Sequence, residues 1–149
     1  MIKNCNGDLL KSGCKVIAHQ TNTAGVMGAG IALQIRKQFP EVYRQYRNYC
    51  LEDFAKIGTV LFLKDASDVW VANCFSQNEW RTDEAAVKSV ALALKSFCTD
   101  NDIHTLGIPY LYGCGIAGGD WTSVSKIFDD VFKDDESVEL QIWKYNPDF

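Results

Sequence analysis

The chain has 149 residues, the size of one folded domain, and 47% of them are hydrophobic while 23% are charged. This balance excludes a disordered polypeptide, and a chain of this length buries enough surface to fold without a metal or a disulfide. The formal net charge of −4 and the lack of a basic run exclude a protein that grips a nucleic-acid backbone by charge. We therefore expect residues 1–149 to form a single domain.

The cysteines and the hydropathy of the chain indicate in which cellular compartment the protein is expected and whether a metal site is expected. No two cysteines form a C-x-x-C pair, so a zinc site is not expected, and most lie in apolar segments, where a free thiol behaves as a small hydrophobe. No apolar stretch is long enough for a membrane span or a signal peptide. These features predict a cytoplasmic protein with no metal, no cofactor and no membrane partner. The six cysteines are Cys5, Cys14, Cys50, Cys74, Cys98 and Cys114.

Hydrophobic periodicity predicts strands that alternate with helices. The nearly continuous apolar runs at 59–65 and 69–75 are typical of strands covered on both faces. After an N-terminal strand we expect, in chain order, a strand at 15–20, helices at 31–39 and 42–50, strands at 59–65 and 69–75, a helix at 83–98, a strand at 104–112, a helix at 124–132 and a strand at 137–145. This order predicts a three-layer α/β/α domain with a central mixed sheet.

Two glycine-rich loops each connect a predicted strand to a predicted helix. The first glycine loop is residues 23–31 (TAGVMGAGI), and the second is residues 113–120 (GCGIAGGD). Helix starts expose free N–H groups and carry partial positive charge, and glycine removes the side chain that would block a phosphate. Two such loops that face each other would hold a diphosphate without lysine or arginine. The alternative is that the glycines only make tight turns.

The second loop also satisfies G-x-G-x-x-G through Gly113, Gly115 and Gly118. That pattern alone suggests a dinucleotide fold, which requires an acidic ribose-binding residue at the end of the following strand. Here the following strand runs into IWKYNPDF without one, and no G-K-[ST] is present. We therefore expect neither a dinucleotide fold nor a Walker-type loop.

Four segments occur in a familiar order: NGDLL, AHQTNTAGVMGAGIA, ANCFSQ and IPYLYGCGIAGGDW. Together they resemble the macrodomain family, which binds ADP-ribose. The matches run from Gly7 to Trp121, so the resemblance covers essentially the whole chain. The chain is most similar to compact bacterial and phage members, and to the branch with ADP-ribose-1''-phosphate phosphatases and hydrolases of DNA- or glutamate-linked ADP-ribose.

The resemblance implies a set of binding residues. Asp8 matches the acid that accepts a hydrogen bond from the adenine amino group, with the Leu9 N–H nearby, and its alternative role is to cap a turn. Asn22 matches the residue that holds the distal ribose, and its alternative role is to bond its own backbone. The residues that match the two phosphate loops are Val26, Met27, Gly28, Ala29, Gly30 and Ile31, and then Gly113, Cys114, Gly115, Ile116 and Ala117.

Three further residues match positions around the ligand. Tyr112 begins the second loop and would pack on the distal ribose, unless it is an ordinary aromatic at a strand end. Tyr145 and Asn146 follow the last predicted strand, where relatives place residues around the adenine, and Tyr145 would stack on the base.

The branches of the family use different catalytic residues. Members that release ADP-ribose from glutamate or DNA use a lysine near the segment NCFSQNEWR, where this chain has Gln77, Asn78 and Glu79. Other members carry a longer glycine loop that ends in an aspartate, and the first loop here has no acid. Both of those mechanisms are therefore not expected.

Three side chains are candidates for chemistry. Asp120 resembles the acid of the glutamate-hydrolase and phosphatase branch and would act as a base, while its alternative role is a helix N-cap. His19 would carry a proton near neutral pH, but a histidine inside an apolar strand also suits the core. Cys114 has no histidine beside it in sequence, so we interpret it as a small loop residue rather than a nucleophile.

The resemblance implies an ADP-ribose-binding macrodomain that hydrolyses a terminal phosphate or ester on the distal ribose. ADP-ribose-1''-phosphate or an ADP-ribosylated protein or nucleic acid would be the substrate, with Asp120, Asn22 and His19 as the catalytic residues. The first alternative is a reader module that binds ADP-ribose without cleaving it. The second alternative is a module that binds another adenine nucleotide.

Overall fold

The computed structural model describes residues 1–145. Six strands form one sheet in the order β1-β8-β7-β2-β4-β3. The strands of this sheet are β1 (Ile2–Asn6), β2 (Val16–Thr21), β3 (Val60–Lys64), β4 (Trp70–Phe75), β7 (Thr105–Pro109) and β8 (Glu139–Lys144). The helices are α1 (Gly30–Gln38), α2 (Pro40–Leu51), α3 (Glu84–Asp100) and α4 (Trp121–Phe132), with a 3-10 turn η1 (Leu9–Lys11) and a small hairpin of β5 (Gln77–Asn78) and β6 (Arg81–Thr82).

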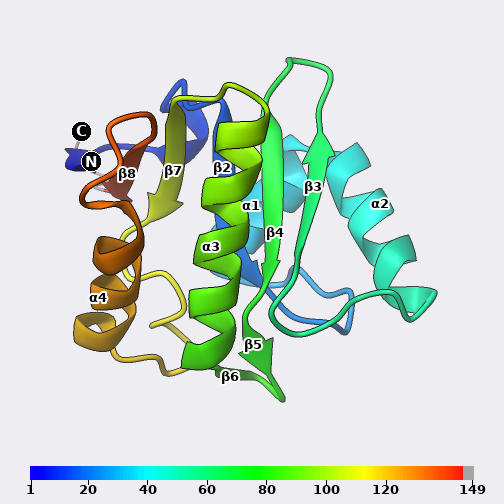
Figure 1. The fold of residues 1–149 in the computed structure, drawn as a ribbon. Coiled ribbons are helices and arrows are strands. Elements are labelled where there is room, and N and C mark those ends of the chain that lie inside the picture. Colours follow the sequence, from blue (N-terminus) through cyan, green and yellow to red (C-terminus); the bar gives the residue numbers. More distant parts are fainter. Residues whose placement is uncertain (146–149) are drawn as a thin grey trace.

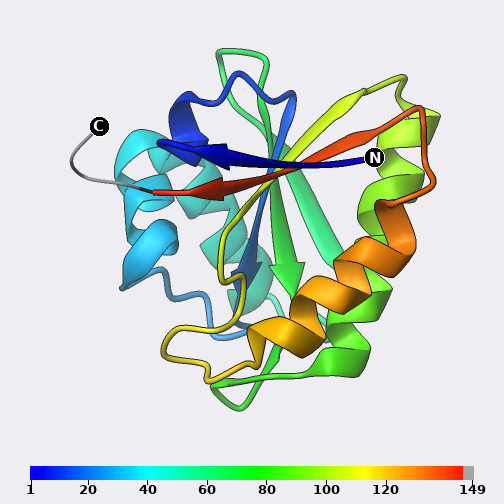
Figure 2. The ribbon, with the colours of Figure 1, turned by 90° about the vertical axis from the view of Figure 1, so that its left-hand side faces the viewer.

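The elements are arranged in three layers, as the sequence predicts. Figure 2 shows α1 and α2 on one face of the sheet and α3 and α4 on the other. The pairs β1–β8, β8–β7, β7–β2 and β2–β4 are parallel, while β3 runs antiparallel to β4, so the sheet is mixed. The predicted α/β/α class with a central mixed sheet is confirmed.

Alternation along the central strands builds a core on each face. In β4, Val71 and Phe75 pack with the helices α1 and α2, whereas Ala72 and Cys74 pack with α3 and α4. The helix α3 starts at Asp83, whose side chain accepts a hydrogen bond from the Ala86 N–H at 3.1 Å. Burial on both faces explains why the sequence of β4 is a continuous apolar run.

The parallel strands bring distant segments to the carboxyl ends of the sheet, and Figure 1 shows β2, β4 and β7 ending toward the bottom of the view. Because β1, β2, β4, β7 and β8 all run in the same direction, their carboxyl ends lie at the same edge. The first glycine loop follows β2, the β5–β6 hairpin follows β4, and the second glycine loop follows β7. Asp8 follows β1 and Tyr145 follows β8, so every segment of the predicted site starts from this edge.

Several elements differ from the sequence-based expectation. The strand predicted at 104–112 ends at Pro109, and Leu111 then adopts a left-handed φ of 63° in a turn. Among the described strands, β3 pairs only with β4 and is half-buried, although Val60 and Phe62 pack against the core on one face and Leu61 and Leu63 against the core on the other. The 3-10 turn η1 and the β5–β6 hairpin were not predicted. Within residues 1–145, no helix combines the length and apolar character that a bilayer crossing requires.

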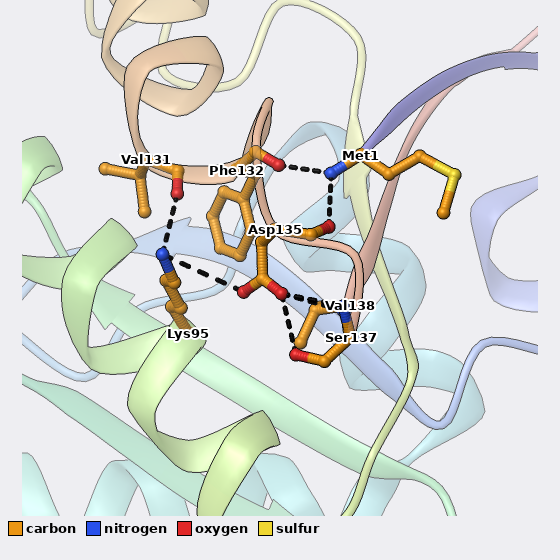
Figure 3. A network of polar contacts seen from close by, with 7 residues as sticks. All are labelled: Met1, Lys95, Val131, Phe132, Asp135, Ser137 and Val138. Atoms are coloured by element: carbon orange, nitrogen blue, oxygen red, sulfur yellow. Dashed lines mark hydrogen bonds and ion pairs between the residues drawn. The ribbon is translucent and has the colours of Figure 1, made fainter.

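A polar cluster, the Asp135 cluster, closes the C-terminal end of α4 (Figure 3). The Asp135 carboxylate accepts hydrogen bonds from Ser137 N and Oγ at 2.8 and 2.6 Å, which hold the pKa of Asp135 below its usual value. Lys95 of α3 donates to the Val131 carbonyl at 3.2 Å and lies 3.8 Å from the carboxylate. The Met1 ammonium donates to the Asp135 carbonyl at 2.7 Å. This cluster joins α3, α4 and the start of β1.

Candidate functional site

A cleft of about 560 Å³ lies at the carboxyl edge of the sheet, between the two glycine loops. Eleven of the predicted ligand-binding residues line it, and they come from both loops. They are Asn22, Val26, Gly28, Ala29, Gly30 and Ile31 on one side, and Tyr112, Gly113, Gly115, Ile116 and Ala117 on the other. The fold therefore places the two glycine loops across one cleft, the arrangement that would hold a diphosphate.

The first glycine loop places the start of α1 at this cleft, and no side chain of the described residues caps that start. Ala29 is the N-cap of α1, and no side chain caps that helix. By contrast, Asp8, Asp83 and Asp120 cap η1, α3 and α4 with their carboxylates. The first N–H groups of a helix have no partner within it, so α1 presents its free N–H groups and its positive dipole end to the cleft. Such an end suits an anion.

The second glycine loop is fixed by hydrogen bonds to residues of β2 and β6 and to Ser76 between β4 and β5. Gly113 has a φ of +69°, and a Cβ there would come within 2.8 Å of Gln20 Oε1 and 2.9 Å of Thr82 Oγ1. Gln20 Nε2 donates to Thr82 Oγ1 at 2.9 Å, and that hydroxyl donates to the Gly113 carbonyl. Ser76 Oγ donates to Gln20 Oε1 at 2.8 Å. Glycine is required at position 113 because both the φ and the close neighbours exclude a side chain.

Asn22 organises the first loop from its base. Its Oδ1 accepts hydrogen bonds from Ala24 N at 3.0 Å, Val26 N at 3.3 Å and Tyr46 Oη at 3.1 Å, and its Nδ2 donates to the Val26 carbonyl at 2.9 Å. The alternative in which this side chain bonds its own backbone is thus what the structure shows. The amide retains one N–H that could donate to a ligand in the cleft.

Within residues 1–145, no Asp, Glu, Lys, Arg or His lines the cleft. Its polar side chains are neutral and include Gln20, Thr21, Asn22 and Gln77. In the same part of the chain, no three His, Cys, Asp or Glu residues gather so that they could hold a metal ion. An anion in this cleft would therefore be neutralised by backbone dipoles and not by a salt bridge.

Tyr112 lines the cleft but turns its ring into the core. Its hydroxyl bonds Ser76 Oγ at 2.7 Å, and its ring packs edge-on against Phe128 with the centroids 5.2 Å apart. Complete burial raises its pKa well above the usual value. This packing matches the core-aromatic alternative that the sequence left open for Tyr112.

Two residues of the predicted phosphate loops point away from the cleft. Met27 is buried in the core beneath the first loop with Ile35 and Phe39. Cys114 directs its Sγ to the Tyr112 carbonyl at 3.3 Å, and burial raises the pKa of its thiol, as does the charge of Asp120. These side chains anchor their loops, while their neighbours along the chain line the cleft.

The residues predicted to bind adenine lie outside the cleft lining. Asp8 accepts a hydrogen bond from Leu10 N at 2.9 Å and caps η1, the role that the sequence left as its alternative. Leu9 packs with Cys14 and Ile17 beneath the sheet edge. Tyr145 is exposed immediately after β8, and Asn146 lies outside the described residues.

His19 and Asp120 also lie outside the cleft lining. His19 is fully buried in β2, where its Nε2 donates to Asn73 Oδ1 at 2.9 Å and its Nδ1 has no partner within the described residues. Burial lowers the pKa of His19 to about 4, so the ring is neutral at pH 7. Asp120 is exposed and caps α4, with Oδ1 accepting from Thr122 N at 3.0 Å. Its Oδ2 has one long contact, 3.4 Å to Ser123 Oγ.

Several lining residues were not predicted from the sequence. Gln20 and Thr21 end β2, Gln77 and Trp80 belong to the β5–β6 hairpin, and Tyr110 and Leu111 precede the second loop, together with Pro109 and Ala32. Their position in the sequence was the available signal, because residues that directly follow parallel strands lie together at the carboxyl ends of those strands.

Comparisons with known proteins agree with this geometry. The family model of the Macro domain matches residues 18–128. A DNA ADP-ribosyl glycohydrolase of Thermus aquaticus is 29% identical over 99% of this chain, and the chain spans 41% of that relative's length. An ADP-ribose 1''-phosphate phosphatase of Lodderomyces elongisporus is 30% identical over 95% of this chain and 97% of its own length.

A solved structure extends the likeness to three dimensions. The macrodomain of Mycobacterium tuberculosis DarG matches with a TM-score of 0.89 at 25% identity, over 96% of this chain and 97% of that chain. The family model alone spans more than half of the sequence, and it includes β2, both glycine loops and most of α4. The chain belongs to the Macro domain family.

Proposed function

We propose that the protein binds ADP-ribose in the cleft and hydrolyses a substituent on the distal ribose, either a terminal phosphate or an ester. The observation that carries this proposal is the uncapped start of α1 facing the second glycine loop across a cleft to which residues 1–145 contribute no charged side chain. A diphosphate fits that environment because it is anionic and compact, and the N–H groups reach it without a cation. The two relatives named above, of which only the phosphatase is of similar length, are named as enzymes that act on ADP-ribosyl compounds.

The strand order gives the ligand a direction. Asp8 and Tyr145 follow β1 and β8 at one end of the sheet, while Gln77 follows β4 toward the other end. With adenine near Asp8, the diphosphate would cross the loops after β7 and β2, and the distal ribose would lie beside Asn22 and Gln77. The scissile bond is therefore expected at the β4 end of the cleft.

Hydrolysis there consumes one water and releases ADP-ribose and the former substituent. The loops fix the diphosphate, so positioning supplies much of the rate. Asp120 ends the second loop, and its Oδ2 is nearly free, so it would accept the proton of the attacking water. The water oxygen then forms the new bond, and the departing group leaves with the broken bond's electron pair and takes up a proton.

A reader module is the second candidate, and one observation favours it. Within the described residues, the cleft lining has no ionisable acid or base, and Gln77 stands in the segment where relatives use a lysine. A binder of AMP or NAD is a third candidate that uses the same adenine and phosphate contacts.

Calorimetric titration with ADP-ribose, AMP and NAD, together with turnover of ADP-ribose-1''-phosphate, separates the three. We expect tight binding of ADP-ribose, weaker binding of AMP and NAD, and phosphate release. Binding of ADP-ribose without release of product from any ADP-ribosylated substrate would favour the reader module. Equal binding of all three nucleotides would favour the general adenine-nucleotide binder, and no binding of ADP-ribose would refute the proposed site.

One glycine variant tests the loops themselves. A Cβ at Gly115 meets nothing within 4 Å, and its φ is not left-handed, so Gly115→Ala leaves the folded protein undisturbed. The new methyl would face the space where the diphosphate is expected, so we predict at least a tenfold loss of ADP-ribose affinity at an unchanged melting temperature. The control is Ser89→Ala, an exposed position on α3 outside the cleft lining, which should keep wild-type affinity. Unchanged affinity in Gly115→Ala would remove the second loop from the binding site.

A further inference from the structure

Tyr46 on α2 is a core residue whose hydroxyl reaches a residue of the candidate site. Its ring is fully buried and stacks on Phe75 with the centroids 6.1 Å apart. Its Oη lies 2.5 Å from the Asn22 carbonyl oxygen and 3.1 Å from Asn22 Oδ1. A phenylalanine would fill the same space in the core, so packing alone does not explain the hydroxyl. The hydroxyl therefore connects α2 to the base of the first glycine loop.

The first glycine loop contacts α2 at a second point. Gly25 has a φ of +81°, and a Cβ there would come within 3.3 Å of Cys50 Cβ and 3.7 Å of Arg47 Cα. Both the φ and the close approach favour glycine at this position. Residues 22–29 belong to no helix or strand, so this stretch has no regular backbone ladder to hold it. Its shape therefore depends on contacts with α2 and on the side chain of Asn22.

The hydrogen bonds of Asn22 determine which way its side-chain amide points. Oδ1 faces three donors, the backbone N–H groups of Ala24 and Val26 and the hydroxyl of Tyr46, while Nδ2 faces the Val26 carbonyl. Rotating the amide by a half-turn would set its NH₂ group against the two backbone N–H groups and its oxygen against a carbonyl. Only one orientation satisfies these partners. Because the oxygen is occupied, Asn22 can donate its second N–H to a ligand but cannot accept from one.

Burial keeps the Tyr46 hydroxyl protonated and thus a donor. Loss of solvent around the phenol raises the pKa of Tyr46 above its usual value, so the group is neutral at physiological pH. Its single proton lies between the two Asn22 oxygens in a three-centre hydrogen bond. A ribose presents hydroxyl oxygens that can accept a hydrogen bond. The free N–H of Asn22 is therefore the complement of a sugar hydroxyl.

We propose that Tyr46 is a positioning residue for Asn22: its hydroxyl holds the side-chain amide so that one N–H donates to a hydroxyl oxygen of the distal ribose. This inference rests on the proposed function, because it assumes that ADP-ribose occupies the cleft with its distal ribose beside Asn22. Tyr46 does not line the cleft, so it acts through Asn22 and not by touching the ligand. The site then favours ADP-ribose over ADP, which ends at the diphosphate and has no distal ribose.

The test compares the dissociation constants of ADP-ribose and ADP, measured by calorimetric titration. Tyr46→Phe removes the hydroxyl and keeps the ring. The matched control is Tyr49→Phe on the same helix, because the Tyr49 ring also stacks on Phe75, with the centroids 6.0 Å apart, and lies outside the cleft lining. Asn22→Ala, alone and combined with Tyr46→Phe, completes a double-mutant cycle.

We expect Tyr46→Phe to raise the dissociation constant of ADP-ribose by about 3- to 10-fold, because the Asn22 amide loses a donor that holds it. The constant for ADP should rise by a smaller factor, so the preference for ADP-ribose over ADP falls. Tyr49→Phe should keep the wild-type preference. In the Asn22→Ala background, adding Tyr46→Phe should change the constant for ADP-ribose less than twofold, because the amide on which the hydroxyl acts is absent.

A measurement on the wild type tests the inference even if Tyr46→Phe does not fold. The Asn22 Nδ2 group gives two proton signals in an amide correlation NMR spectrum, and their absence from the Asn22→Ala spectrum identifies them. We expect ADP-ribose to shift the proton that is not bonded to the Val26 carbonyl more than it shifts the other, and ADP to shift neither to that extent. Two unshifted signals with ADP-ribose bound would show that Asn22 donates nothing to the ligand and would overturn the inference.

The outcomes separate this inference from the proposed function. If the wild type does not bind ADP-ribose, the proposed function fails and the inference with it. If it binds ADP-ribose and Tyr46→Phe keeps the wild-type preference over ADP, only the positioning role is overturned. An equal loss with and without the Asn22 side chain would show that Tyr46 supports the backbone of the loop, which also contradicts positioning through the amide.

Discussion

Asp120 caps α4 and is also the base of the proposed reaction, two roles that one carboxylate can hold at once. Its Oδ1 caps α4 through Thr122 N, while Oδ2 has only the long contact with Ser123. Asp120 and Glu84 both raise the pKa of the Cys114 thiol by their charge, so two carboxylates flank the second glycine loop. The two differ in position: Glu84 lies in the first turn of α3, whereas Asp120 directly continues the loop.

The variant Asp120→Asn distinguishes the helix-capping role of this side chain from its proposed role as a general base. Asparagine caps a helix as well as aspartate does, so we expect an unchanged melting temperature. Loss of the carboxylate should lower turnover of ADP-ribose-1''-phosphate by about 100-fold, with ADP-ribose binding retained. The control is Glu84→Gln, which removes an equivalent charge and should turn over at the wild-type rate. Full activity in Asp120→Asn would exclude this carboxylate as the base.

The buried imidazole of His19 makes the stability of the core depend on pH. Asn73 Nδ2 donates to the Leu61 and Val71 carbonyls, so its Oδ1 must accept from His19 Nε2. The imidazole is then neutral with its Nδ1 unprotonated, and protonation would place a buried charge in the sheet. This placement makes His19 a structural residue, and proton transfer in the cleft finds no support in its geometry.

The consequence is a loss of stability in acid. The pKa of His19 is about 4 in the folded protein against 6.5 unfolded, so the unfolded chain binds more protons below pH 6.5. Stability from the neutral ring is present above pH 6.5 and falls as pH drops toward 4. We expect urea unfolding of the wild type to lose about 2 kcal/mol more than His19→Gln between pH 7 and pH 5. The exposed His104→Gln is the control, and equal slopes in wild type and His19→Gln would contradict the assignment.

At the scale of elements, the long strands and helices were predictable and the short elements were not. The apolar spacing along α3 and the continuous runs of β3 and β4 are signals that extend over several residues. The strands β5 and β6 have two residues each and no periodicity, and their turn has Glu79-Trp80 where a hairpin signal would be Asn-Gly. The β7 strand was predicted too long because Tyr110 and Tyr112 continue the aromatic pattern past Pro109.

The candidate site was predictable where it depends on backbone and less so where it depends on contacts between elements. Glycines at strand-to-helix junctions indicated both loops. Gln20 and Thr82 could not be identified, because each acts through a hydrogen-bond partner on another strand or loop. The sequence also does not show in which direction a side chain points. Met27 and Cys114 lie within the loop motifs, yet their side chains point into the protein.

The contact between the hairpin and the second loop can be tested through Thr82. Thr82→Val keeps the shape of the side chain but removes the hydroxyl that joins Gln20 to the Gly113 carbonyl. We expect a loss of about 1–2 kcal/mol in unfolding free energy and a severalfold weaker affinity for ADP-ribose, because the loop loses its support. Thr122→Val, exposed on α4, is the matched control for both measurements. A Thr82→Val protein with wild-type affinity would show that the loop keeps its shape without the hairpin.

At the scale of the whole molecule, the candidate residues of the described chain lie where the parallel strands end, apart from His19, which lies within β2. Segments that follow β1, β2, β4, β7 and β8 meet there although they are spread along the whole sequence. The opposite edge carries the connections from α3 to β7 and from α4 to β8, whereas the connection from α2 to β3 lies at the carboxyl edge, where Gly58 N donates to the Phe75 carbonyl at 2.8 Å. The single-domain and cytoplasmic assignments stay predictions.

The position of β1 has a consequence for how the protein matures. This strand is synthesised before the other strands of the sheet, yet its sheet partner is β8, with Ile2 opposite Leu140. On the ribosome, β1 must therefore wait unpaired until the last strand has emerged from the exit tunnel. The strand β7, which leads into the second loop, also lacks its outer neighbour during that time. A nascent chain halted before β8 would carry both glycine loops and still be unable to hold a ligand.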